Sequence, residues 1–211
     1  PRAHEAMTAL NGLRVLDVGC AFGASLQVAE SWEWDGYGLE LNPHALALAR
    51  EKLGSRVMCG DFESVELQEQ SYDTILMFDV LEHLPDPSRA LAKVNRTLRP
   101  SGLVVINTPC TQSLSAKLMR RIWFHLKAEH LFLFSQKNLM LLLEQHGFQC
   151  LLMRPSVKAL HLLYIDHILQ RYRVPWLSAL VHLMTSVVPR DLTYLNFYTW
   201  SGDMFVIAKK L

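Results

Sequence analysis

Residues 14–23 read RVLDVGCAFG: a short apolar run, RVLDV, stops at Gly19, and a helical pattern begins at Gly23. A strand that ends in small residues and passes directly into a helix lets a ligand approach the backbone amides at the start of that helix. Outward from this turn, four more short apolar runs alternate with amphipathic helical patterns as far as residue 107. Because the connections are too long for hairpins, this alternation predicts a parallel sheet covered by helices on both faces.

The boundaries of the expected elements follow from glycines, prolines and helix-capping residues. Strands are expected at residues 14–18, 37–41, 56–59, 72–78, 102–107, 148–153 and 202–209, and helices at residues 23–30, 43–53, 87–98 and 135–146. The rhythm changes after Pro109. A basic and aromatic segment, about 111–134, and a strongly apolar one, about 155–200, are expected to form helical lids over the substrate of a single domain, residues 1–211.

The composition excludes several classes of protein. Of the 211 residues 50% are hydrophobic, and the formal net charge of +1 argues against a protein that binds nucleic acid. The four cysteines form no CxxC pair, which argues against a disulfide framework or a structural zinc site and favours the cytoplasm. The longest uncharged apolar stretch, 174–188, is shorter than the roughly 20 residues that a membrane-spanning helix needs. No metal site is expected, and the oligomeric state is left open.

Acidic residues follow the next three strands of the predicted sheet. Glu40 closes the second strand, where a carboxylate can accept both hydroxyls of a ribose. Asp61 and Asp79 follow the third and fourth strands, so all three carboxylates are expected along the same edge of the sheet. The dinucleotide fingerprint GxGxxG is absent, because Ala21 and Ala24 replace two of its glycines. A nucleoside with a zwitterionic tail therefore fits this turn better than NAD.

Several of these segments resemble a known family. VLDVGCAFG, GLELNP, GDF and YDTILMFDVLEHLPDPSRALAKVNRTLRPSGLVVINTP are similar to class I S-adenosylmethionine-dependent methyltransferases, closest to the small-molecule branch that includes the ubiquinone/menaquinone methylases. The resemblance covers about residues 12–153, and GDMFVIAK matches the family's terminal strand. It implies an α/β, three-layer Rossmann-like fold with a mostly parallel seven-stranded sheet, an antiparallel last strand and helical lid insertions. Ala21 departs from the pattern, since the family usually has glycine there.

The resemblance also implies S-adenosyl-L-methionine as the cofactor and assigns residues to its two ends. The residues at the nucleoside end would be Glu40 at the ribose and Leu41, Asp61 and Phe62 at the adenine. The residues around the methionyl end would be Asp17, Gly19, Cys20, Gly23, Phe78, Asp79 and His83.

Catalysis of methyl transfer to a hydroxyl also requires removal of a proton, which suits an imidazole. His83 and His130 are the candidate bases, and the expected acceptor is a small or lipid-like molecule that is methylated on oxygen or carbon. The aromatic and basic character of the lid segments also fits peripheral contact with an anionic lipid surface. A non-catalytic S-adenosylmethionine-binding partner and a structural interaction domain are the alternatives.

Overall fold

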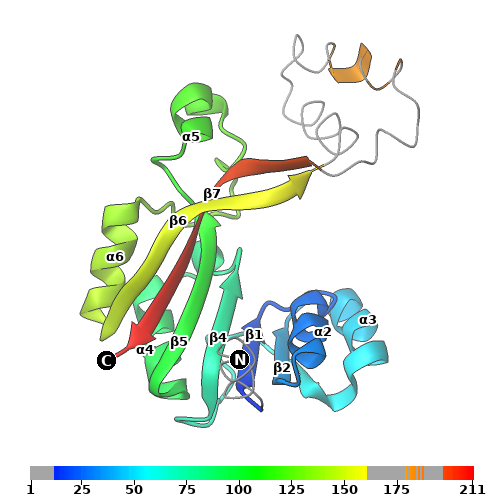
Figure 1. Cartoon of the computed structure of the whole chain (residues 1–211), viewed down its shortest axis with the longest axis vertical. Helices are drawn as coiled ribbons and strands as arrows, with labels where there is room; N and C mark the ends of the chain where they lie inside the picture. Colours follow the sequence, from blue (N-terminus) through cyan, green and yellow to red (C-terminus); the bar gives the residue numbers. More distant parts are fainter. Residues whose placement is uncertain (1–11, 161–178, 180, 184, 186, 188–196) are drawn as a thin grey trace, which may run out of the picture.

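The structure is a computed structural model that describes residues 12–160, 179, 181–183, 185, 187 and 197–211 (Figure 1). In chain order its strands are β1 (Arg14–Val18), β2 (Asp35–Glu40), β3 (Val57–Cys59), β4 (Tyr72–Phe78), β5 (Leu98–Pro109), β6 (Phe148–Leu160) and β7 (Phe197–Lys210). Its α-helices are α2 (Ala24–Ser31), α3 (Pro43–Leu53), α4 (Pro87–Thr97), α5 (Leu114–Met119) and α6 (Gln136–Gln145). Three short 3-10 turns complete it: η1 (Gly54–Arg56), η2 (Leu81–His83) and η3 (Arg120–Ile122).

The strands of the described residues form one seven-stranded sheet in the order β3-β2-β1-β4-β5-β7-β6. Strands β1 to β5 pair in parallel, while β7 runs antiparallel to both β5 and β6. The expected fold class, an α/β Rossmann-like sheet with an antiparallel last strand, is confirmed. Helices α2 and α3 lie beside β2, and α4 and α6 lie beside the β4–β7 half of the sheet (Figure 1).

Local sequence signals explain where two of the helices begin. The Asn42 side chain caps α3 by accepting hydrogen bonds from the backbone N–H groups of His44 and Ala45. The Asp86 side chain does the same for α4, and a proline occupies the first turn of both helices. A capping side chain followed by proline was the expected start signal. The cap accepts hydrogen bonds from unpaired N–H groups of the first turn, and the proline has no N–H to satisfy.

The sheet register brings the ends of neighbouring strands to one edge. Val18 pairs with Leu39 on one side and with Met77 on the other, so Gly19 follows directly between β2 and β4. Strands β2 and β3 are added on one side of β1, and β4 is then added on its other side. Such a reversal of strand order is where ligands bind in open α/β sheets.

Strands β6 and β7 differ from the sequence prediction. They pair from Phe148 and Lys210 as far as Leu160 and Phe197, so both ends of the expected lid at 155–200 are strand. Register shifts at Cys150/Leu152 and Pro155/Val157 let a proline enter this pairing, since a bulge removes the need for its missing N–H. Most of residues 161–196 lie outside the described residues. In the other expected lid, 111–134, the helical parts are α5 and η3.

Buried apolar side chains form two clusters. The larger includes Leu16, Ile75, Leu91 and Leu143, and joins α4 and α6 to the sheet. The smaller packs α2 and α3 against the sheet and contains Leu26 and Cys20. All four cysteines are free thiols. Within the part of the chain that the structure describes, no helix is both long enough and apolar enough to cross a membrane.

Candidate active site

The turn after β1 is shaped for close approach to its backbone. Gly19 has φ 71°, and a Cβ atom there would lie 2.9 Å from Val80 Cγ2. Its N–H donates to the Leu39 carbonyl at 2.8 Å, which ties the turn to the end of β2. Ala21 adopts φ 46°, so alanine accommodates the left-handed conformation where the family usually has glycine. Gly23, with φ 75°, is the N-cap of α2 and packs against α3.

Glu40, at the end of β2, is buried and holds this turn with both carboxylate oxygens. Oε2 accepts a hydrogen bond from the Ala21 N–H at 2.8 Å, and Oε1 accepts one from the Asn42 N–H at 2.7 Å. Each carboxylate oxygen has two lone pairs, so each keeps one for a further donor. The side chain can therefore support the glycine turn and accept the two hydroxyls of a ribose at the same time.

Asp17, before the turn, and Cys20, within it, are both buried. Asp17 is 3% exposed, and its carboxylate accepts a hydrogen bond from the Ser25 hydroxyl at the start of α2. Burial raises the pKa of Asp17 to about 7, against the opposite effect of the Ser25 hydrogen bond. Burial, together with the carboxylates of Asp17 and Glu40, raises the pKa of the Cys20 thiol to about 12. A cationic group placed near Asp17 would favour its ionised form.

The expected adenine contacts differ in exposure. Leu41 is 63% exposed beside Glu40 and is free to cover an aromatic ring. Asp61 is half-buried and its Oδ1 accepts a hydrogen bond from the Glu63 N–H at 3.2 Å, so the carboxylate also stabilises the loop after β3. Phe62, by contrast, is 3% exposed and lies in the large core cluster, with the Lys93 ammonium 5.1 Å from its ring centre. The Phe62 side chain therefore packs in the core behind the expected adenine site.

Phe78 is the last residue of β4, and Asp79 follows it. Phe78 is partly exposed, and Asp79 has φ 55°, a conformation that aspartate tolerates better than most residues. Asp79 Oδ1 accepts a hydrogen bond from the Asn107 side chain at 2.9 Å, and Oδ2 pairs with Lys158 Nζ at 3.1 Å. Lys158 also pairs with the buried Asp203, at 2.8 Å. Burial acts to lower the pKa of Lys158, but the Asp203 and Asp79 carboxylates outweigh it and raise the pKa.

The two candidate bases, His83 and His130, come together although they are far apart in the sequence. Their ring centroids are 4.8 Å apart in an edge-to-face arrangement. His83 Nδ1 lies 2.7 Å from the Glu129 carbonyl oxygen; because a carbonyl only accepts, Nδ1 carries the proton. The His130 ring stacks on His125 at 5.7 Å, and His125 pairs with Asp203 at 3.0 Å. Burial and the neighbouring His83 lower the pKa of His130.

Glu82 completes this cluster from inside the protein. It is 1% exposed, and its Oε2 accepts a hydrogen bond from the Thr108 hydroxyl at 2.9 Å. Burial raises the pKa of the Glu82 carboxyl. The Glu82 carbonyl accepts the Phe132 N–H at 3.1 Å, so η2 is tied to the segment that carries His130.

The methyltransferase domain family matches residues 3–152 of the chain. The chain belongs to this methyltransferase family. Among curated proteins, the ubiquinone biosynthesis O-methyltransferase of Methylococcus capsulatus is 27% identical over 121 residues, which make up 54% of this chain and 51% of that protein. This methyltransferase chain thus spans about half the length of the curated relatives that it matches.

Solved structures share the fold of this methyltransferase. A SAM-dependent methyltransferase of Methanosarcina mazei is 21% identical with a TM-score of 0.61, and the match covers 95% of this chain and 93% of that chain. The phosphoethanolamine N-methyltransferase 2 of Haemonchus contortus, solved with phosphomonomethylethanolamine and S-adenosylhomocysteine, is 20% identical with a TM-score of 0.57. That match covers 99% of this chain and 52% of that chain.

S-adenosylmethionine is the cofactor of this methyltransferase domain, and the observed residues fit it. Gly19 has φ 71° and lies so close to Val80 that a Cβ would be crowded, so the turn requires glycine at this position. Glu40 retains two lone pairs for a ribose, and buried Asp17 has a raised pKa that a ligand ammonium would relieve. These are the groups that a nucleoside with an amino-acid tail requires.

Sequence reasoning missed several polar contacts beside the candidate site of this methyltransferase. Thr108 bonds to Glu82, and Asp203 pairs with His125 and with Lys158, although the partners lie far apart in the sequence. Lys158 lies on the part of β6 that continues beyond residue 153, the expected end of the strand. No local spacing connects these residues. The signal available was weaker: a lysine in an apolar strand pattern, and an aspartate beside Gly202, which has φ 89°.

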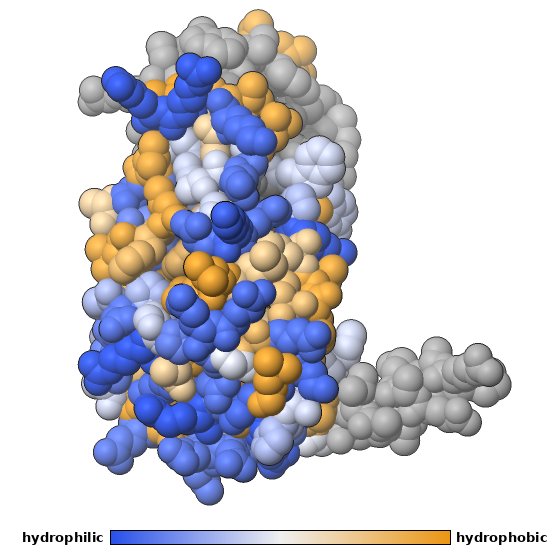
Figure 2. Space-filling model, turned by 90° about the vertical axis from the view of Figure 1, so that its left-hand side faces the viewer, coloured by the Kyte–Doolittle hydropathy of each residue, from blue (hydrophilic) through white to orange (hydrophobic). Residues whose placement is uncertain are grey.

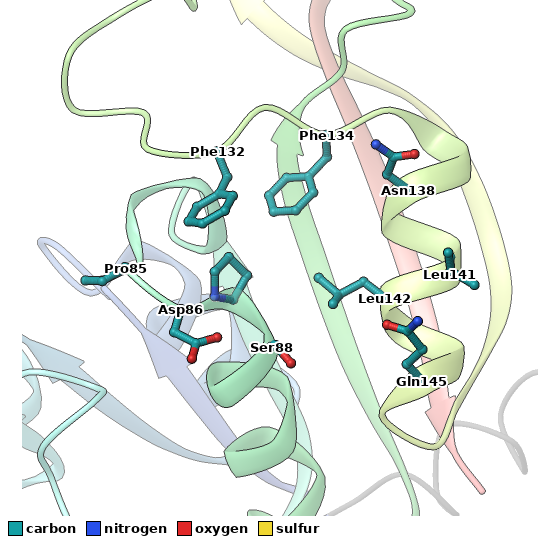
Figure 3. A pocket seen from close by; sticks show the side chains of 10 residues that line it. Pro85, Asp86, Ser88, Phe132, Phe134, Asn138, Leu141, Leu142 and Gln145 are labelled. Carbon is teal, nitrogen blue, oxygen red and sulfur yellow. The ribbon is translucent and has the colours of Figure 1, made fainter.

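Two hollows flank α4. One, of about 430 Å³, is polar and lies between α4 and the loop after β3; its lining includes Lys93 and Glu66. The other, of about 340 Å³, is an apolar groove between α4 and α6, where Phe132, Phe134 and Leu142 face one another (Figure 3). Exposed apolar side chains also appear among polar ones on the α6 side of the molecule (Figure 2).

Proposed function

We propose that this protein transfers the methyl group of S-adenosylmethionine to an oxygen of a small-molecule acceptor that carries an apolar part. The observation that supports this proposal is the meeting of His83 and His130, with ring centroids 4.8 Å apart, directly beyond the strand end that borders the cofactor site. Two imidazoles at this position suit an acceptor that has to lose a proton as it is methylated.

The chain's own residues mainly orient the reactants. Bound S-adenosylmethionine supplies a methyl group that is activated by its sulfonium. Glu40 and the turn at Gly19 hold the nucleoside and the methionyl end, and Asp17 pairs with the ammonium. Fixing the acceptor oxygen in line with the methyl carbon and the sulfur supplies most of the acceleration expected of such an enzyme. Because His83 carries its proton on Nδ1, its Nε2 is the atom available to accept a proton.

The apolar groove supports an acceptor with a lipid-like part. Phe132 lines the groove, and its N–H donates to the carbonyl of Glu82, next to His83. An apolar tail that leaves the histidine pair in this direction would therefore meet Phe132 first and then Leu142 (Figure 3). The name of the Methylococcus capsulatus relative, an O-methyltransferase, supports oxygen as the acceptor atom.

We further propose that the segment around α5 rests on an anionic lipid surface. Leu114, Leu118 and Ile122 are 61%, 74% and 57% exposed. Lys117 and Arg121 come from the same segment. Apolar and basic side chains in one exposed segment are typical of peripheral contact with anionic lipid. The free cysteines support a reducing compartment such as the cytoplasm.

A radiolabelled methyl-transfer assay tests the proposal. Wild-type protein is incubated with labelled S-adenosylmethionine and a panel of hydroxylated aromatic and lipid-like compounds, with exposed Glu51→Gln as a control variant. We expect transfer by the wild type and by the control, and a loss of about 10²–10⁴-fold in His83→Gln and His130→Gln. Binding of S-adenosylhomocysteine without transfer to any acceptor would favour a non-catalytic binding protein instead.

A further inference from the structure

We infer that Glu82, His83 and His130 form a binding site for a divalent transition-metal ion on the acceptor side of the methyltransferase site. One ligand atom from each residue lies within 4.8 Å of the other two. Two imidazole nitrogens and one carboxylate oxygen are a common ligand set for Zn²⁺ and Fe²⁺, with coordination positions left open. The binding of the ion does not depend on the proposed function, but its role in the reaction does.

Glu82 and His130 each have one buried potential ligand atom without a partner in the described part of the chain. Glu82 Oε1 and His130 Nδ1 have no hydrogen-bond partner among the residues that the structure describes. A buried polar atom without a partner is costly, and native proteins rarely leave one unsatisfied. The cost is greatest for a carboxylate oxygen, and Glu82 is 1% exposed. A cation between these atoms would satisfy both of them.

Glu82 and His83 each have a hydrogen bond through the side-chain atom that would not bind the ion. Glu82 Oε2 accepts the Thr108 hydroxyl at 2.9 Å, and His83 Nδ1 donates to the Glu129 carbonyl at 2.7 Å. His130 in turn has a hydrogen bond with the backbone of His125. Metal-binding histidines and carboxylates almost always have such outer partners, which orient the ring and fix the tautomer. These bonds leave Nε2 of His83 and Oε1 of Glu82 available to bind an ion.

The distances require only a small closure around an ion. With bonds of about 2.0–2.2 Å, neighbouring ligand atoms around a zinc ion lie about 3–3.5 Å apart. The three atoms therefore need to approach by no more than about 1–2 Å. Glu82 and His83 are adjacent in η2, and the bond between Phe132 N–H and the Glu82 carbonyl already ties this turn to the chain beside His130.

An ion at this position would bind the acceptor oxygen and lower the pKa of its hydroxyl. The hydroxyl proton then goes to solvent water, the oxygen forms a bond to the methyl carbon, and the carbon–sulfur bond breaks. The electron pair of that bond stays on sulfur, which leaves a neutral thioether. In this arrangement the two histidines hold the ion, and the acceptor class is an alcohol, phenol or enol whose oxygen can coordinate it.

Titration with Co²⁺ tests the site, because its visible absorption reports the coordination. The protein is first stripped with a chelator and carries Cys59→Ser, which removes the exposed thiol as a competing ligand. We expect one equivalent of Co²⁺ to bind with nitrogen and oxygen ligands. Affinity should fall at least about tenfold in Glu82→Gln, His83→Ala and His130→Ala, and severalfold in Thr108→Val, which leaves all three ligands in place.

Two matched variants and a second measurement serve as controls. His146→Ala and Glu66→Gln remove a histidine and a carboxylate elsewhere and should bind Co²⁺ as the wild type does. S-adenosylhomocysteine affinity and melting temperature show whether each ligand variant is folded. If Co²⁺ binds no more weakly to the folded ligand variants than to the wild type, the inference is overturned.

Activity separates this inference from the proposed function. Methyl transfer that is lost on chelation and restored by Zn²⁺ or Co²⁺ supports both. Transfer that is unchanged by chelation, in protein that binds no Co²⁺, overturns the metal site and leaves the histidines as bases. One equivalent of Co²⁺ bound through the three residues, without transfer to any acceptor, supports the site and contradicts the proposed function.

Discussion

Replacement of Glu40 by alanine should weaken cofactor binding and loosen the turn that forms the site. In the structure its carboxylate accepts hydrogen bonds from the Ala21 and Asn42 N–H groups, at 2.8 and 2.7 Å. A hydrogen bond to a charged group contributes about 1.5–3 kcal/mol. Loss of one such contact to the ribose should raise the dissociation constant of the cofactor about 10- to 150-fold. The N–H groups of Ala21 and Asn42 are near solvent. Loss of their hydrogen bonds to Glu40 should therefore lower the free energy of unfolding by about 1–3 kcal/mol and the melting temperature by several degrees.

Calorimetric titration with S-adenosylhomocysteine and with its 2′-deoxy analogue separates the two effects. Wild-type protein should lose affinity when the 2′-hydroxyl is absent, whereas Glu40→Ala should bind the two ligands almost equally. A looser turn alone would lower the affinity for both ligands by the same factor and preserve the ratio between the two affinities. Exposed Glu51, on α3, provides the matched control: Glu51→Gln should behave as the wild type in both titrations.

The same penalty for the deoxy analogue in Glu40→Ala and in the wild type would refute the role of Glu40 at the ribose. Glu40→Gln adds a second check. One oxygen of the carboxylate becomes an NH₂ group, which then faces a backbone N–H that it cannot accept. Its cofactor affinity should therefore fall nearly as far as that of the alanine variant, although the side chain keeps its size.

Further predictions concern Asp17, Gly19 and Leu141. Because the pKa of Asp17 is raised to about 7, the empty folded protein holds a proton there that the unfolded chain releases near pH 4, so stability should fall as pH rises from about 4 to 7. Over the same range, affinity for S-adenosylhomocysteine should rise, and Asp17→Asn should remove both dependences. Gly19→Val should abolish cofactor binding in calorimetry, since φ 71° and Val80 leave no room for a branched side chain. Leu141→Gln, on the groove, should raise the KM for tailed acceptors severalfold and leave short ones unchanged.

The elements that sequence analysis predicted well have local causes. Strand β1 has the expected bounds, 14–18, because a buried apolar run is followed by Gly19, whose positive φ ends the strand in a turn. Helix α3 begins where Asn42 and Pro43 place it, because the cap and the proline act within one turn. The seven-stranded sheet with an antiparallel last strand was expected from the family resemblance, since no local pattern determines which strands become neighbours.

The sheet's far edge and the acceptor side were harder to predict for a physical reason. Strand β6 continues to Leu160 because it pairs with β7, and the gain from that pairing is not visible in either segment alone. The expectation of no metal site came from ligand spacing along the chain, which detects local motifs only. His130 joins Glu82 and His83 through tertiary contacts, so spacing along the chain could not reveal this candidate set of ligands.

Asp79 is where the two halves of the site depend on each other. In the proposed site, the cofactor contacts lie at the ends of β1 to β4, and the acceptor would lie beyond β4 and β5, next to the β6–β7 extension. Asp79 follows Phe78 on the cofactor wall, yet its N–H and its carboxylate are held by Asn107, and the carboxylate also pairs with Lys158. Lys158 is fixed in turn by the buried Asp203 on β7. Contacts from β5 and β6 therefore stabilise the left-handed backbone at Asp79. A change that displaces β6 or β7 should then also alter the proposed cofactor site, and cofactor affinity would report it.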